Sequence, residues 1–194
     1  MRVKKSLVYD YVENKLSKDR YAHVLRVIEK AISLAKIHDV DVEKAEIAAL
    51  LHDVAKEIPK LQLSGMLKIS TEADYVKHHH NIWHAPAGKL IAEHTMGVLD
   101  LDILNAIKYH TTGRAGMSLL EQVIFVADYI EDGRAHDGVE AVRLCSTDLD
   151  KATFVTLTQT IAKLETADAS IHPDTLDAFA YYKDKAQHKG EEKK

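Results

Sequence analysis

Apolar residues recur every three or four positions along most of the chain, which is the period of an amphipathic helix. After a short N-terminal helix, the clearest such stretch begins at the favourable N-cap Ser17 and carries apolar side chains such as Val24 on one face. Asp41 caps the next predicted helix, which runs to about Ile58, just before Pro59. The pattern therefore predicts an all-helical protein.

Helical periodicity continues after a polar stretch at residues 60–82, which has one possible short helix at its start. The later predicted helices span residues 87–94, 100–109, about 150–167 and 173–187. Pro86 suits the first turn of the earliest of them. One more helix begins at Leu119; its segment VIFVA alone could form a buried strand, but its neighbours fit a helix better.

The chain is expected to form one domain. Its 194 residues are enough for one well-filled core and not clearly for two, and we see no repeat or linker. We therefore expect a single helical-bundle domain over residues 1–187, with a core at about 18–132 and C-terminal helices at about 137–187 packed on it. Residues 188–194 are expected to form a frayed polar tail.

Composition excludes several classes of protein. A net charge of −4 and a pI near 6.3 argue against a broad nucleic-acid-binding face. No apolar run approaches the ~20 residues of a membrane span, and the N-terminus has no signal-peptide pattern. The single cysteine, Cys145, rules out an internal disulfide and is expected to be a small buried residue. We therefore expect a cytoplasmic protein with neither nucleic acid nor membrane as partner.

The twelve histidines are many for this length. Some lie on, or at the end of, the inward face of a predicted helix, and two aspartates join them. The set is His23, His52, Asp53, His84, His110 and Asp128. Each residue alone has an ordinary explanation, such as a hydrogen bond in the core or an ion pair. One bundle would have difficulty satisfying all of them separately, whereas a metal centre satisfies them at once.

The donor atoms indicate which metals suit this set. Imidazole nitrogen and carboxylate oxygen together suit iron, manganese or zinc. Six ligands exceed what a four-coordinate zinc site needs, which points to two ions ~3.5–4 Å apart with a carboxylate between them. His52 and Asp53 are adjacent on a helix, so their side chains point about 100° apart. They can reach one ion from two sides, or Asp53 can bridge to its neighbour.

Cationic and hydroxyl side chains flank the set. They are Arg20, Lys56, Thr111, Thr112, Arg114 and Arg134. Arginine suits bidentate contact with phosphate, and the loop threonines can add further donors. For any one of these cations taken singly, a solvated surface position is the alternative. Because the protein is anionic overall, attraction for a polyphosphate must come from this local cleft.

The order of the ligands carries a resemblance. His23, then His52–Asp53, then Asp128 is the signature of the HD-domain superfamily of metal-dependent phosphohydrolases. The segments RYAHVLRV, ALLHDVAKE, WHAPAG, AIKYHTTGRAGMS, VADYIEDGR and IHPDT also resemble successive blocks of the bacterial YqeK family. Members of that family are symmetrical diadenosine-tetraphosphate hydrolases. One departure is Asp132, where the family pattern would place proline.

The resemblance implies an HD-domain helical bundle that uses iron, although the residues also fit manganese or another divalent metal. The shared ligands would be His23, His52, Asp53 and Asp128, and His84 and His110 would hold a second iron. The implied reaction cuts diadenosine tetraphosphate in the middle to give two ADP. The family also makes a homodimer an expectation.

We interpret the chemistry as in-line attack of a metal-activated water on a phosphoanhydride. The expected catalytic residues are Asp53, Lys56, Arg114 and Arg134, the last three because they can stabilise charge on the transferring phosphoryl group. The partner would be a dinucleoside polyphosphate, with ADP or a GDP-like nucleotide as product. Two alternatives stay open: a nucleotidase or triphosphohydrolase acting on mononucleotides, and a catalytically silent nucleotide-binding regulator.

Overall fold

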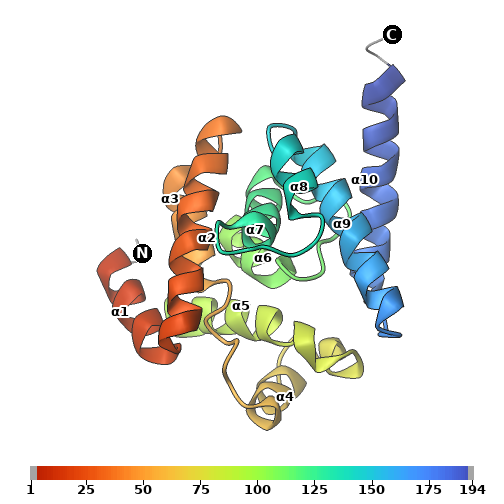
Figure 1. Ribbon diagram of the computed structural model, residues 1–194. Helices are drawn as coiled ribbons and strands as arrows, with labels where there is room; N and C mark the ends of the chain where they lie inside the picture. The colour runs from red at the N-terminus through yellow and green to blue at the C-terminus, as the bar shows by residue number, and fades with distance from the viewer. Residues whose placement is uncertain (1–3, 192–194) are drawn as a thin grey trace.

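The computed structural model describes residues 4–191, which form helices joined by turns and loops (Figure 1). The elements are α1 (Lys5–Lys15), α2 (Lys18–Ile37), α3 (Val42–Leu51), α4 (Lys60–Lys68), the 3₁₀ turns η1 (Ala73–Lys77) and η2 (His80–Ile82), α5 (His84–His94), α6 (Leu101–Tyr109), α7 (Leu119–Ile130), α8 (Val139–Cys145), α9 (Leu149–Thr166) and α10 (Pro173–Glu191). The all-helical prediction is therefore confirmed for the described residues. No helix among them is long and apolar enough to cross a bilayer.

Helix α7 lies at the centre of the bundle, where it contacts α2, α3, α6, α8 and α9. Every side chain from Leu120 to Ala127 is buried, as a helix surrounded by others requires. A capping box fixes its start: Ser118 Oγ accepts the amide N–H of Glu121, and the Glu121 carboxylate accepts the amide N–H of Ser118. The helix that carries Asp128 is therefore firmly held.

Helix α2 begins as the sequence predicts. Ser17 Oγ accepts the amide N–H of Arg20, and the predicted apolar face, from Val24 to Ala35, is buried. This face packs on α3 and α7, and Figure 1 shows α2 running beside both. Because His23 lies on the same face, the packing directs its imidazole into the interior.

Helix α3 ends earlier than the sequence predicts. Asp41 caps it as expected, by accepting two amide N–H groups of the first turn, but the helix ends at Leu51 rather than near Ile58. The chain continues through successive turns with backbone bonds from residue i to i+3, which are tighter than an α-helix. The reason is tertiary, because side chains of other helices hold the buried carboxylate of Asp53 in this segment.

The stretch before α5 also differs in detail. The possible short helix is α4, and the turns η1 and η2, which the sequence does not predict, follow it. Helix α5 begins at His84 rather than at Ala87. The indole N–H of Trp83 donates to the carbonyl oxygens of Tyr75 and His78 and thereby folds the polar segment back onto the start of α5.

The C-terminal part contains one helix more than the sequence predicts. Helix α8 follows Gly138, whose φ of 85° lies in the left-handed region that favours glycine. Helix α9 packs on α7, and α10 packs on α9. Helix α10 continues to Glu191, past the predicted end at Gln187; the rest of the predicted tail, 192–194, lies outside the described residues. Cys145 is half-buried rather than buried.

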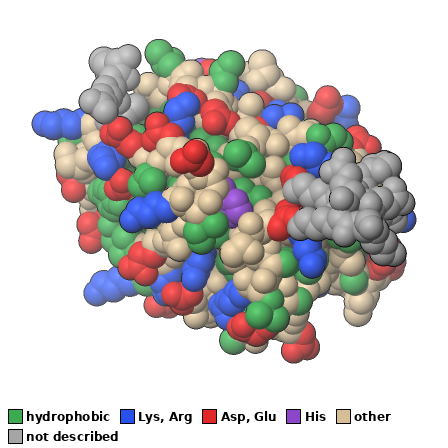
Figure 2. Space-filling model, turned by 90° about the horizontal axis from the view of Figure 1, so that it is seen from above, with side chains coloured by type: hydrophobic (Ala, Val, Ile, Leu, Met, Phe, Trp, Pro, Cys, Tyr) green, Lys and Arg blue, Asp and Glu red, His purple; other side chains and the backbone are tan. Residues whose placement is uncertain are grey.

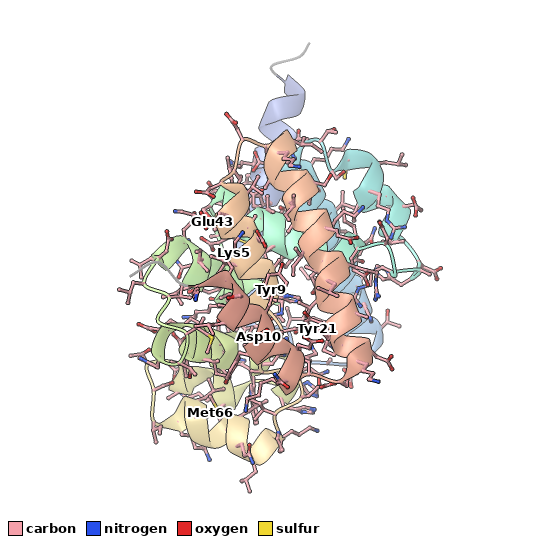
Figure 3. The ribbon with its side chains drawn as sticks, turned by 90° about the vertical axis from the view of Figure 1, so that its left-hand side faces the viewer. Lys5, Tyr9, Asp10, Tyr21, Glu43 and Met66 are labelled. Atoms are coloured by element: carbon pink, nitrogen blue, oxygen red, sulfur yellow. The ribbon has the colours of Figure 1, made fainter. Side chains whose placement is uncertain are left out.

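Helix α1 closes one side of the bundle. In Figure 3, Lys5 and Tyr9 lie along α1 in front of α3. Both bind Glu46 of α3, with 2.8 Å from Lys5 Nζ to one carboxylate oxygen and 3.0 Å from the Tyr9 hydroxyl to the other. The buried side chains of Val8 and Val12 complete the contact. These two polar contacts join α1 to α3, the helix that ends just before His52.

Candidate metal centre

Five segments bring the predicted ligands together inside the bundle: α2, the turn after α3, the first residue of α5, the end of α6, and α7. The residues they contribute are His23, His52, Asp53, His84, His110 and Asp128. All are buried except Asp128, which is partly exposed. Helix α5 packs against the end of α3: a Cβ at Gly88 would be in van der Waals contact with the carbonyl oxygen of His52, 3.4 Å away.

The carboxylate of Asp53 lies at the centre of the group. Its Oδ2 lies 3.5 Å from His52 Nε2 and 3.7 Å from His23 Nε2. Its Oδ1 lies 3.2 Å from His84 Nε2 and 3.7 Å from His110 Nε2. One carboxylate therefore faces two pairs of imidazoles, one pair with each oxygen.

Asp128 approaches from the other side, with its Oδ1 3.1 Å from His23 Nε2. Two sets of potential ligand atoms result, and within each set the atoms lie within 4.8 Å of one another. The sets are His23, His52 and Asp128, and His52, Asp53 and His110. His84 Nε2 adjoins the second set, 3.1 Å from His110 Nε2.

Orphaned polar atoms show that a metal fits this arrangement. His23 Nε2, His52 Nε2 and Asp53 Oδ1 are buried without a hydrogen-bond partner. The Nδ1–H of His52 donates to the carbonyl oxygen of Ala49 at 2.6 Å, so the His52 Nε2 lone pair is free. An unsatisfied buried polar atom costs roughly 1–3 kcal/mol. A divalent ion with nitrogen and oxygen ligands would satisfy all three atoms.

The protonation states suit metal binding as well. Burial lowers the pKa of His52 and of His84 to about 4. Burial raises the pKa of Asp53 and of Asp128, but the neighbouring histidines outweigh this effect, and the pKa of each carboxyl group lies below its usual value. At neutral pH these imidazoles are neutral and the carboxylates are ionised, which are the forms that coordinate metals.

Three of the predicted cations contact these residues. Arg20 Nη1 donates to Asp53 Oδ2 at 3.0 Å, and Arg134 Nη2 donates to Asp128 Oδ1 at 2.7 Å. Lys56 Nζ lies 3.2 Å from His84 Nε2. All three side chains keep some exposed surface, so each contacts a residue of the buried His and Asp group and also faces solvent.

The fourth predicted cation, Arg114, is engaged differently. Its guanidinium makes two hydrogen bonds with the carboxylate of the buried Glu121, at 2.7 and 2.6 Å, and lies over the ring of Tyr109. The structure therefore brings Arg114 to the start of α7, with its donors committed to Glu121, rather than against the central histidines.

A cavity of 480 Å³ opens beside His23, and three arginines line it: Arg20, Arg26 and Arg134. Sequence reasoning missed Arg26. The spacing could have found it, because residues three apart on a helix share a face, and Arg26 follows His23 by three positions. Three carboxylates, of Asp19, Glu57 and Glu131, line the same opening, so basic and acidic side chains are balanced along it.

The predicted threonines lie in a second cavity, of 390 Å³, together with Ile82 of η2 and with Thr160 and Leu164 of α9. The Thr112 hydroxyl donates to the carbonyl oxygen of Gly113, whereas Thr111 Oγ1 is buried and has no hydrogen-bond partner. Because Thr111 follows His110 directly, this cavity begins next to the second pair of histidines.

The HD domain is the known family whose sequence model matches this chain, over residues 20–133. The matched segment contains every member of the buried His and Asp group. This chain belongs to the HD-domain family. Outside the ligands, its departure at Asp132 is accommodated by an ion pair of 2.7 Å with Lys30 of α2.

Relatives of this HD domain are similar over most of their length. A protein of Bacillus subtilis (strain 168) named "Bis(5'-nucleosyl)-tetraphosphatase, symmetrical" is 43% identical over 167 residues, 85% of this chain and 90% of that protein. A protein of the same name from Staphylococcus aureus is 39% identical over 176 residues, 88% and 90% of the two chains. The crystal structure of a predicted HD superfamily hydrolase from Clostridium acetobutylicum superposes with a TM-score of 0.88 at 36% identity, over 94% and 98% of the two chains.

Replacing Asp53 tests the centre. Asp53→Asn keeps the volume but removes the charge toward which both pairs of histidines converge, so we expect bound divalent metal to fall to a small fraction of the wild-type content. Elemental analysis of the purified variant measures this. Asp132→Asn, which changes an exposed carboxylate nearby, serves as control and should keep its metal. Wild-type metal content in Asp53→Asn would refute the ligand assignment.

Proposed function

We propose that this HD-domain protein hydrolyses dinucleoside tetraphosphates symmetrically, with diadenosine tetraphosphate giving two ADP. The observation that carries the proposal is the carboxylate of Asp53, whose two oxygens face separate pairs of histidines beside an opening lined by arginines. Such a centre suits attack on phosphorus. The relatives named symmetrical tetraphosphatases, at 39% and 43% identity, support the substrate class.

The metal is proposed to be iron, with manganese as the next candidate. The proposed ligands are His23, His52, Asp53 and Asp128 for a first ion, and His84 and His110 for a second that shares Asp53. When bound, such ions supply Lewis acidity and lower the pKa of water towards ~7. The orphaned nitrogens of His23 and His52 and the two-sided carboxylate of Asp53 support this assignment.

One contact favours a centre with a single ion instead. Lys56 Nζ lies 3.2 Å from His84 Nε2, and an ammonium group there would repel a second cation. In that case His84, His110 and Lys56 would bind the substrate phosphates directly. Metal content per chain in the active protein separates the two arrangements.

The arginines are proposed to hold the polyphosphate. Arg20 and Arg134 each donate to a carboxylate of the centre and remain partly exposed, so their other donors are available to phosphate oxygens. Figure 2 shows acidic and basic side chains mixed over one face of the molecule, and the net charge is −4. Attraction for a polyanion therefore depends on these local groups. A phosphate-binding role for Arg114 stays a prediction, because its guanidinium is hydrogen-bonded to the carboxylate of Glu121.

One nucleoside is proposed to lie in the cavity beside Thr111. Its lining combines the apolar side chains of Ile82 and Leu164 with hydroxyl groups, which suits a nucleobase and ribose. The volume of 390 Å³ falls in the range of small-molecule sites. With the nucleoside there and the next phosphates over the histidines, the cut would fall in the middle of the chain of four phosphates.

The remaining partner and location assignments follow from the same proposal. The substrate is a small nucleotide, the product is ADP or a GDP-like nucleotide, and neither nucleic acid nor a membrane is a partner. We also propose a cytoplasmic location, where such nucleotides occur, and a homodimeric state.

Product analysis tests the reaction. With diadenosine tetraphosphate, we expect ADP as the sole product, because a centrally placed cut leaves two phosphates on each nucleoside. Chromatography of an early time point measures this. AMP plus ATP would contradict the symmetrical cut. Faster turnover of mononucleotides would favour a nucleotidase or triphosphohydrolase, and tight binding without hydrolysis by the metal-loaded protein would favour a regulator.

Removing Arg134 tests the phosphate-binding role. We expect Arg134→Ala to lower kcat/KM by about 10²–10³-fold, the usual effect of removing a donor to developing negative charge. Steady-state kinetics with diadenosine tetraphosphate measures this. Lys36→Ala, which removes an exposed cation at the far end of α2, is the control and should change kcat/KM less than about twofold. An unchanged kcat/KM in Arg134→Ala would argue against the role.

Filling the second cavity tests the nucleoside position. Thr160→Trp places an indole in the cavity, so we expect KM for diadenosine tetraphosphate to rise at least about tenfold, the effect of losing one well-made contact. Thr158→Trp, on the exposed side of the same helix, is the matched control. Equal KM values for the two variants would place the nucleoside elsewhere.

A further inference from the structure

Glu131 is a buried carboxylate that the proposed ligand set does not include. It follows α7 directly and is 2% exposed. Its Oε1 lies 3.2 Å from His23 Nδ1. Its Oε2 accepts hydrogen bonds from Arg26 Nε and from the amide N–H of Gly133, each at 2.6 Å. Every oxygen of this carboxylate is therefore engaged.

The contact with His23 fixes which nitrogen of the ring carries the proton. A carboxylate accepts hydrogen bonds, so His23 Nδ1 is the donor. Nε2 lies 3.1 Å from Asp128 Oδ1 but makes no hydrogen bond, which leaves this nitrogen available to a metal ion that Asp128 could share. His52 and His110 are oriented differently, since their Nδ1 atoms donate to backbone carbonyl oxygens. Of these three rings, only His23 has a charged side chain as the partner of its Nδ1.

The surroundings hold Glu131 in place from several directions. Besides Arg26, the guanidinium of Arg143 donates to the backbone oxygens of Glu131 and Arg134, at 2.9 and 3.0 Å. Gly133 leaves room for this arrangement, because a Cβ at that position would lie 2.6 Å from Arg26 Nε and would shift the guanidinium that binds Glu131. The same short turn thus fixes both Glu131, which faces His23, and Arg134, which faces Asp128.

We propose that Glu131 is a positioning residue for metal binding: it orients His23, keeps its Nε2 unprotonated and makes that nitrogen a stronger donor to a metal ion. Carboxylates that orient metal-binding histidines typically change metal affinity by 10–100-fold. The inference rests on the proposed function only in requiring that a divalent ion binds at His23. Its test uses Mn²⁺ and no nucleotide, so a wrong substrate assignment would leave the result intact.

The experiment compares two isosteric substitutions. Glu131→Gln keeps the shape and removes the charge; Glu72→Gln does the same to a carboxylate that is also buried and bound by Lys89 and Lys108 but contacts none of the ligands. Metal-free proteins are titrated with Mn²⁺ in competition with a chromogenic chelator. We expect Glu131→Gln to weaken Mn²⁺ binding by about 10–100-fold and Glu72→Gln to change it less than about twofold. Equal losses in both variants, or no loss in Glu131→Gln, would overturn the proposal.

A measurement on the unaltered protein keeps the test decisive if Glu131→Gln does not fold. Long-range ¹H–¹⁵N correlation spectra of the metal-free protein, recorded at mildly alkaline pH, report which nitrogen of His23 carries the proton. We expect the Nδ1–H tautomer, assigned through loss of the signal in His23→Gln. A predominant Nε2–H tautomer would overturn the proposal, because a merely structural Glu131 would not determine the position of this proton.

Discussion

The arrangement of the bundle depends on one buried carboxylate. Asp53 is 2% exposed, and an ionised carboxylate away from water is costly unless opposite charge and donors surround it. Arg20 supplies a hydrogen bond, and histidines from α2, α5 and the end of α6 surround both oxygens. The helices that carry these side chains must therefore converge on one point. The same requirement explains why the chain leaves the α-helical path after Leu51.

The convergence of these side chains has a free-energy cost that a metal ion could offset. His23 Nε2, His52 Nε2 and Asp53 Oδ1 are buried without a hydrogen-bond partner. An ion that binds only the folded chain offsets this cost and stabilises the fold in proportion to its affinity. Metal binding at this centre would therefore stabilise the helices that converge on it.

Charged contacts between α2 and the turn after α7 connect the centre to its opening. Arg26 binds Glu131, and Lys30 binds Asp132, so two consecutive acidic residues are tied to one helix. The turn they fix carries Arg134 into the opening. One short turn therefore positions both Glu131, which faces His23, and Arg134, which faces Asp128.

The sequence by itself determined the helical fold and the composition of the His and Asp group, because helical periodicity and N-caps such as Ser17 are local properties. It also indicated the family, since the order His23, His52–Asp53, Asp128 is readable along the chain. Only the tertiary structure decided that α3 ends at Leu51, that Glu121 engages Arg114, and that Glu131 orients His23. These outcomes depend on contacts between residues distant in sequence or on competition between partners, and neither leaves a periodic signal.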